Sequence, residues 1–292
     1  MSFTLLLTDV VSPLGKTLEH ELERESFKLL APGAAIDWTN PTSFANYLNE
    51  HQVDLVLNCR GWEEAYHSGG QSPLLQTAES LSITCSAEGI PLIHFSSYSV
   101  FGADVKGTHS EKDAVAPLNE TGHAFAAAEQ QIAQVPKHII LRLSWVIGAY
   151  GDNLLTRLLS AYLAGASVSV NRQLRGAPTA LSDAARVAVA LAKQISCGAD
   201  NWGVMHYCSS DSCTQDEFAE QLLQLLIQQQ LLTAEPSLTL VDEEPENEPL
   251  SAILGCRRVR DYFGVQARSW RPSLLPLVKQ WLHNREQHKT PV

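Results

Sequence analysis

The chain has 292 residues, of which 45% are hydrophobic and 18% charged, and its formal net charge is −11. This balance is typical of a globular protein and excludes an intrinsically disordered one. An acidic chain without a basic stripe repels phosphate backbones, so we expect no nucleic-acid partner. Apolar runs stay shorter than the ~18 residues of a membrane-spanning helix, and no basic signal segment precedes the first run, which predicts a cytoplasmic protein without a membrane anchor.

The first half of the chain alternates buried-strand patterns with helical patterns. Near-continuous apolar runs are typical of parallel strands that helices cover on both faces. We expect such strands at residues 4–7, 53–58, 91–95 and 138–141, and helices at 14–24, 42–51, 72–88 and 122–134. The alternation predicts an α/β protein with a doubly wound parallel sheet of the Rossmann type, whose core is formed by residues 1–150.

The second half has a looser pattern that predicts a smaller lobe. We expect helices at residues 153–164, 182–194, 214–230 and 272–283, and a short strand at 202–207. The helix at 214–230 begins with Thr214-Gln-Asp-Glu217, a capping box that satisfies the first backbone amides of a helix. Residues 151–292 are expected to form mainly this lobe, with segments that return to the core.

Residues 8–15, TDVVSPLG, occupy the first strand-to-helix turn, where a dinucleotide-binding fold needs glycines. Thr8 and Gly15 fit the T-G-x-x-G-x-x-G pattern, but Asp9 and Ser12 stand at its first two glycine positions. The Asp9 carboxylate would compete with the phosphates at the helix N-terminus, and Ser12 adds a Cβ where the backbone must approach them. The turn keeps the packing glycine and lacks the two that serve the pyrophosphate; a turn unrelated to nucleotides remains an alternative.

Later segments carry a family resemblance. HFSSYSVFG resembles the strand end that bears the active-site Ser or Thr of extended short-chain dehydrogenase/reductases. LRLSWVIGAYGDN resembles the R-x-S-W-V-Y-G-x-x-G-x-N signature of dTDP-4-dehydrorhamnose reductases, and VSVNRQLRGAPTALSDAAR resembles their D-Q-x-G-x-P-T segment. These stretches lie at residues 94–102, 141–153 and 168–186, with weaker echoes at 36–40, 204–219 and 261–270. Because the segments follow in the family's order, the resemblance covers nearly the whole chain.

The resemblance implies a Rossmann-type sheet with a small C-terminal substrate-binding lobe, and NAD(P)H-dependent reduction of a keto group on a nucleotide sugar. In active members a tyrosine is the acid, a lysine lowers its pKa and holds the ribose, and a Ser or Thr polarises the carbonyl. Ser97 matches the Ser/Thr position. Gly122 and Glu129 set the register of the next helix, which puts Thr121 at the tyrosine position and Phe125 at the lysine position. Neither residue can take over the family role.

The cofactor side departs from the family as well. The stretch KLLAPGAA has neither an acidic residue for a ribose hydroxyl nor an arginine for a 2′-phosphate. NCRGW, with Cys59, Arg60 and Trp62, replaces a run of small residues beside the adenine. We therefore expect no cofactor, or NADP(H) only if the cleft is still open, and we expect Trp62 to fill the empty cleft.

On the substrate side, Arg172 and Arg175 stand where active relatives bind the nucleotide part of the substrate, and Asn153 is expected in the same substrate-type pocket. The two arginines could hold a phosphate or form surface salt bridges. His123 is expected to point away from the site and Tyr98 to serve packing, although either could substitute as an acid. The spacing of the cysteines and histidines fits no strong zinc pattern, so no metal is expected.

Two hypotheses about function follow. We favour a non-catalytic relative, a pseudoenzyme that acts as a binding or regulatory subunit or as a metabolite sensor; the beta subunit of methionine adenosyltransferase is built on this fold and has such a role. Its partner would be another protein, a second copy of this chain, or a nucleotide sugar or other metabolite. The alternative is an active NADP(H)-dependent reductase or epimerase that acts on a nucleotide sugar through unorthodox acid residues.

Overall fold

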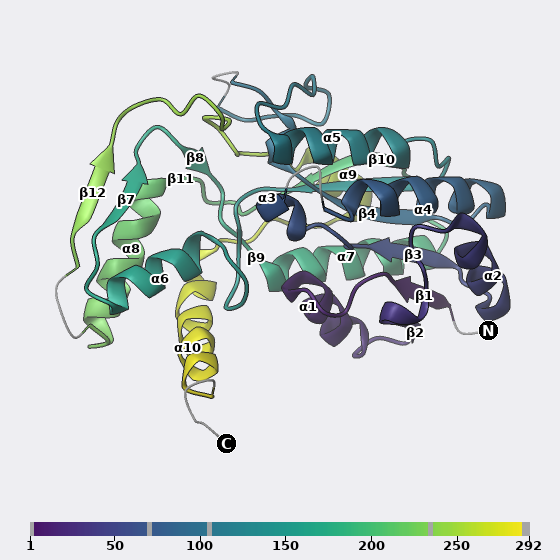
Figure 1. The fold of residues 1–292 in the computed structure, drawn as a ribbon, viewed down its shortest axis with the longest axis horizontal. Helices are drawn as coiled ribbons and strands as arrows, with labels where there is room; N and C mark the ends of the chain where they lie inside the picture. Colours follow the sequence, from purple (N-terminus) through teal and green to yellow (C-terminus); the bar gives the residue numbers. More distant parts are fainter. Residues whose placement is uncertain (1–2, 69–71, 104–106, 233–235, 288–292) are drawn as a thin grey trace.

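The computed structural model describes residues 3–68, 72–103, 107–232 and 236–287 (Figure 1). Its centre is a six-stranded sheet in the order β10-β5-β4-β3-β1-β2, and every neighbouring pair is parallel. The strands are β1 (Thr4–Leu7), β2 (Lys28–Leu30), β3 (Leu55–Asn58), β4 (Leu92–Ser97), β5 (His138–Leu143) and β10 (Gly203–Tyr207). The predicted Rossmann-type parallel sheet is confirmed.

Helices cover both faces of this sheet (Figure 1). One face carries α1 (Pro13–Leu22) and α7 (Leu181–Ser196), which pack on each other, and the other carries α4 (Leu74–Glu88) and α5 (Glu120–Ile132) with α2 (Pro41–His51) beside α4. The covered central strands are fully buried, which explains their unbroken apolar sequences.

Two short helices were not predicted, α3 (Glu64–Ser68), which contacts α5, and α9 (Arg257–Phe263), which contacts β10. Each is too short to show a helical period in the sequence. Among the described residues, no helix has the length and apolarity that crossing a bilayer requires.

The remaining elements form a second packed region beside the carboxyl ends of the strands (Figure 1). Its buried side chains include Tyr162, Phe218 and Trp270. Asn153 and Thr214 each close a capping box, at α6 and α8 respectively, as the Thr214 motif predicted. The elements are β6 (Val146–Ile147), α6 (Leu154–Leu163), β7 (Val168–Asn171), β8 (Arg175–Gly176), β9 (Thr179–Ala180), β11 (Cys213–Thr214), α8 (Gln215–Gln228), β12 (Leu238–Val241) and α10 (Arg271–Gln287). Two 3-10 helices, Gly33–Ala35 and Tyr98–Val100, follow β2 and β4 respectively.

A buried ion pair ties α5 to the sheet below it. The guanidinium of Arg142 on β5 donates to Glu129 on α5 at 2.6 and 2.8 Å, and Ser96 on β4 donates to the same carboxylate at 2.6 Å. The two hydrogen bonds from Arg142 and the third from Ser96 compensate the charges of the buried guanidinium and carboxylate for the loss of water. This contact sets the position of α5, and with it the position of residues 121 and 125.

Candidate functional site

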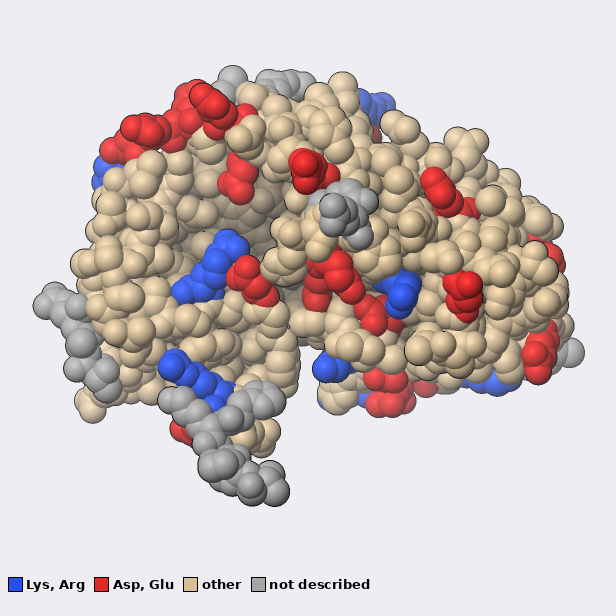
Figure 2. Space-filling view, in the orientation of Figure 1, with Lys and Arg blue, Asp and Glu red and all other residues tan. Residues whose placement is uncertain are grey.

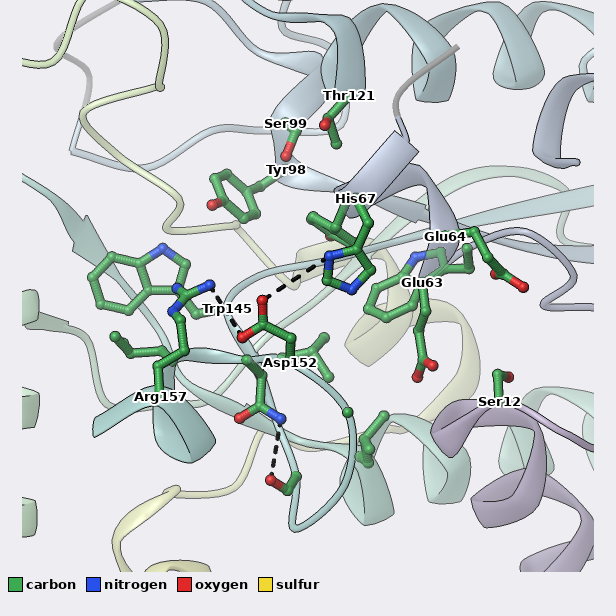
Figure 3. A pocket seen from close by; sticks show the side chains of 18 of the residues that line it. Ser12, Glu63, Glu64, His67, Tyr98, Ser99, Thr121, Trp145, Asp152 and Arg157 are labelled. Atoms are coloured by element: carbon green, nitrogen blue, oxygen red, sulfur yellow. Dashed lines mark hydrogen bonds and ion pairs between the residues drawn. The ribbon is translucent and has the colours of Figure 1, made fainter. Parts of the chain in front are cut away.

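A cleft of about 700 Å³ lies between the sheet and the second region. Figure 2 shows a hollow on this face with acidic side chains around it. In Figure 3, Tyr98, Ser99 and Thr121 lie on one side of the cleft, Trp145 and Arg157 on another, and Glu63 and Ser12 on a third. The cleft therefore joins the α1 turn to the lobe side.

Hydrogen bonds connect β1 and β3 at the floor of the cleft. The strand order reverses between these two strands, and doubly wound sheets bind ligands at that point. Thr8 Oγ1 donates to Asn58 Oδ1 at 2.8 Å and accepts from the backbone amides of Cys59 and Arg60 at 3.2 and 3.3 Å. Cys59 is buried, and burial raises the pKa of its thiol. Thr8 and Cys59 thus hold the turn together, while Arg60 lines the cleft.

The amides at the start of α1 already have acceptors within the chain. Asp9 Oδ1 accepts from Val11 and Ser12 at 2.8 and 3.4 Å, and Ser12 Oγ accepts from Gly15 at 3.1 Å. Glu63 Oε1, from the segment after β3, accepts from Leu14 at 3.0 Å. Residue 13 is proline and has no amide to offer.

The glycine at 15 serves packing, as the turn pattern predicted. A Cβ there would collide with the backbone carbonyl oxygen of Asp9. The α1 turn can therefore close tightly onto β1 only with glycine at this position.

The environment of Glu63 is unusual for a carboxylate. Burial raises its pKa to about 7, and the negative charges of Glu64 and Asp9 add to the effect. The hydrogen bond from the Leu14 amide and the charge of Lys16 oppose the shift. Glu63 consequently holds a proton in part at neutral pH while it occupies the N-terminus of α1.

Ser97, at the end of β4, is fully buried beneath Tyr66. The hydroxyl of Tyr66 on α3 donates to Ser97 Oγ at 2.8 Å, and Ser97 Oγ donates to Ser99 Oγ at 2.9 Å. Tyr66 and Ser99 line the cleft, whereas Ser97 lies behind them. The family's Ser/Thr position therefore reaches the cleft only through other side chains.

Thr121 and Phe125 both face α3. Thr121 Oγ1 donates to the carbonyl oxygen of Ala65 at 3.1 Å. Phe125 is fully buried, and its ring centroid lies 5.4 Å from that of Tyr66. Trp62 packs 5.1 Å from Tyr66 and donates from Nε1 to Ser96 O at 3.1 Å. Trp62 is part of the wall, so the expectation that it fills the cleft is wrong.

The other candidate acids lie in different settings. His123 is exposed on α5 and is not among the lining residues of the cleft. Tyr98 packs on the core and also lines the cleft, so packing is only part of its role. Burial raises the pKa of Tyr98 well above that of an ordinary tyrosine.

The lobe side of the cleft carries a cation that the motifs did not single out. Arg157 on α6 lines the cleft and lies 3.6 Å from Asp152, which lies 4.0 Å from His67 (Figure 3). Asn153, at the N-cap of α6, accepts from the amides of residues 155 and 156 and also lines the cleft. The only sequence signal for Arg157 is its place one helical turn after Asn153.

Arg172 and Arg175 lie outside the lining of this cleft, contrary to the expected substrate pocket. Arg172 pairs with Asp216 and Asp242, each at 3.6 Å, which is the surface salt-bridge alternative. Arg175 is exposed, and its backbone pairs with Leu250 and Thr214 at the edge of the lobe. The motif placed both arginines near the nucleotide, but Arg172, just after β7, and Arg175, on β8, lie outside the lining of the cleft.

Residues 3–282 match the family described as RmlD substrate binding domain. The chain belongs to this family. The resemblance that the sequence motifs carried is thereby confirmed over nearly the whole chain. Among the described residues of this RmlD-family chain, no three His, Cys, Asp or Glu side chains are grouped so as to hold a metal ion.

Curated relatives and solved structures of the RmlD family extend the likeness. The dTDP-4-dehydrorhamnose reductase of Aggregatibacter actinomycetemcomitans is 24% identical over 92% of this chain and 96% of its own length. That of Escherichia coli is 23% identical over 94% and 93%. The Bacillus anthracis reductase in complex with NADP has a TM-score of 0.80 at 22% identity and covers 96% of this chain and 99% of its own. The Clostridium acetobutylicum reductase reaches 0.81 at 21% identity, with 95% and 99% covered.

Proposed function

We propose that this protein binds a nucleotide sugar in the cleft between the sheet and the lobe. The observation that carries the proposal is the cleft of about 700 Å³, which is within the range of small-molecule sites. On its lobe side Trp145 offers an aromatic face, Asn153 an amide and Arg157 a guanidinium. A base, a diphosphate and a sugar need such groups, and the relatives named above act on a dTDP-sugar.

The residues present do not fit a dinucleotide at the α1 turn. The amides that would bind its pyrophosphate already bond to Asp9, Ser12 and Glu63. The two carboxylates would also repel phosphates. Phe125, buried at the lysine position, offers no charge to a nicotinamide ribose. We therefore derive no hydride step for this chain, and the sugar-binding proposal stands without one.

Reductase or epimerase activity is the second candidate. The named relatives are reductases, so the comparisons favour this alternative over a regulatory subunit. Within the site, the observation in its favour is the Tyr66 phenol, hydrogen-bonded to the serine at the family's Ser/Thr position. NADP(H) could occupy the α1 turn only if Glu63 left the Leu14 amide. Nucleotide-sugar binding is common to both candidates, while a protein partner or second copy belongs to the non-catalytic one.

Calorimetric titration with dTDP-glucose, UDP-glucose and NADPH separates these candidates. We expect binding of at least one nucleotide sugar and none of NADPH. In thermal unfolding, a ligand at 100 times its Kd should stabilise the fold by about 2.7 kcal/mol. Binding of NADPH would restore the reductase candidate, and failure of both sugars to bind would refute the proposal.

A further inference from the structure

Tyr66 covers the serine that the family uses at its reacting centre. Its hydroxyl donates a hydrogen bond to Ser97 Oγ at 2.8 Å, and Ser97 Oγ donates in turn to Ser99 Oγ at 2.9 Å. The Ser99 amide also donates to Ser97 Oγ at 3.0 Å. Because Ser97 is fully buried and Tyr66 lines the cleft, a ligand in the cleft meets the tyrosine before it can meet the serine.

The two family positions that lack their usual residues both serve to hold Tyr66. Thr121 bonds to the carbonyl oxygen of Ala65, the residue before Tyr66, at 3.1 Å. The Phe125 ring packs against the tyrosine ring with a centroid distance of 5.4 Å. A lysine at 125 would bury an ammonium group among aromatic rings, without an acceptor in view. The changes at 121 and 125 and the tyrosine at 66 therefore form one rearrangement, in which α3 supplies the phenol.

The cleft around this phenol is acidic. Asp9, Glu63, Glu64, Asp152 and Glu248 line it, against the guanidinium groups of Arg60 and Arg157. A carboxylate on the sugar would share the cleft with these like charges, which costs free energy in a partly enclosed site. A neutral sugar can accept and donate hydrogen bonds there without that repulsion.

We infer that Tyr66 is a specificity-determining residue that contacts a neutral hexose of the bound nucleotide sugar, and that Ser97 and Ser99 are its positioning residues. The inference rests on the proposed function. With its hydrogen committed to Ser97, the phenol oxygen accepts a hydrogen bond from a sugar hydroxyl. Desolvation of the Tyr66 phenol in the wall of the cleft raises its pKa well above its ordinary value, so the group stays neutral across the working pH range.

The test compares Tyr66→Phe with Tyr262→Phe, a control at an exposed tyrosine on α9. Affinities for dTDP-glucose, UDP-glucose, dTDP and UDP are measured by calorimetry. We expect Tyr66→Phe to lower the affinity for the better-bound nucleotide sugar about tenfold, because one good hydrogen bond is lost, and to leave the affinity for its nucleoside diphosphate unchanged. An unchanged affinity for the sugar would overturn the inference. Failure of the wild type to bind any of the four would instead overturn the proposed function beneath it.

Two further comparisons separate recognition from mere structure. Ser97→Ala should weaken the affinity for the nucleotide sugar but not the affinity for the nucleoside diphosphate. Ser97→Thr, which keeps the hydroxyl, should restore the affinity for the nucleotide sugar. UDP-glucuronic acid should bind about tenfold more weakly than UDP-glucose, because its carboxylate meets the acidic lining. Equal binding of the two would contradict the charge argument, and a Ser97→Thr variant as weak as Ser97→Ala would contradict the positioning role.

Discussion

The carboxylate of Glu63 meets the Leu14 amide at 3.0 Å, at the end of a helix where a phosphate would be favoured. Asp9 and Ser12 bond to the neighbouring amides. The helix start thus has an internal anion in place of a ligand. Burial makes this arrangement sensitive to pH, because the Glu63 pKa lies at about 7 in the folded protein against an ordinary value of 4.5.

Replacing Glu63 by glutamine should flatten the pH dependence of stability. Below pH 4.5 the wild-type side chain is protonated in both the folded and the unfolded chain. As the pH rises from 4.5 through 7, the unfolded chain ionises first, so the wild type loses stability, and Glu63→Gln does not. Because the group is partly exposed, we expect a difference of about 1–2 kcal/mol, less than the full shift implies.

Denaturant unfolding between pH 4 and 8 measures this difference. Glu79→Gln is the matched control, since Glu79 is an exposed glutamate on α4 and is not among the groups that shift the pKa of Glu63. Parallel stability profiles for wild type and Glu63→Gln would show that Glu63 ionises normally in the folded protein.

At the scale of elements, the α1 turn depends on close approach between its glycine and β1. The backbone of Asp9 lies where a Cβ at residue 15 would stand. The Ser12 cap and the proline at residue 13 then start the helix directly after the turn. The turn lies where a dinucleotide-binding loop would lie, and the acceptors for its amides are side chains of this protein.

Gly15→Ala should lower the free energy of unfolding by about 1–3 kcal/mol, because the added methyl must displace backbone. Gly107→Ala is the control, since a Cβ at that exposed position meets nothing within 4 Å. Thermal and urea unfolding of both variants gives the comparison. If alanine lowers the free energy of unfolding equally at the two positions, close packing of the turn does not require glycine at residue 15.

At the scale of the whole molecule, the cleft draws on both regions of the chain. Tyr66 and Glu63 come from the sheet side, and Arg157 comes from α6 on the lobe side. Arg172 points to other partners, Asp216 and Asp242, at the outer part of the lobe. In the proposed complex, Arg157 rather than Arg172 or Arg175 is therefore the lobe-side arginine that would meet the diphosphate.

Arg157→Ala should lower the affinity for a nucleoside diphosphate and for its glucose conjugate about tenfold each, because a charged hydrogen bond to the diphosphate that they share is lost. Arg172→Ala should leave both affinities unchanged. Calorimetry on the two variants decides between the arginines. An effect of Arg172→Ala equal to that of Arg157→Ala would place the phosphates at the outer lobe instead.

Much of the fold is local in origin and could be predicted from the sequence. Continuous apolar runs marked the central strands, and the capping residue Thr214 marked the start of α8. The collinear motifs indicated the family, and the residues at 121 and 125 indicated that its usual acid and cation are missing. These features depend on neighbours within a few positions, so residue order alone carries them.

The site itself was decided by the tertiary structure. The contacts that shape it join residues far apart in the chain: Glu63 with Leu14, 49 positions away, and Tyr66 with Ser97, 31 positions away. No periodicity or cap records such pairs, because they arise only when distant segments pack together, as α3 packs against α5 and Tyr66 bonds to Ser97 at the end of β4. The sequence by itself determined the family and the sheet, and it predicts that the usual catalytic pair is absent. Only the packing of distant segments decided which side chains now face the cleft.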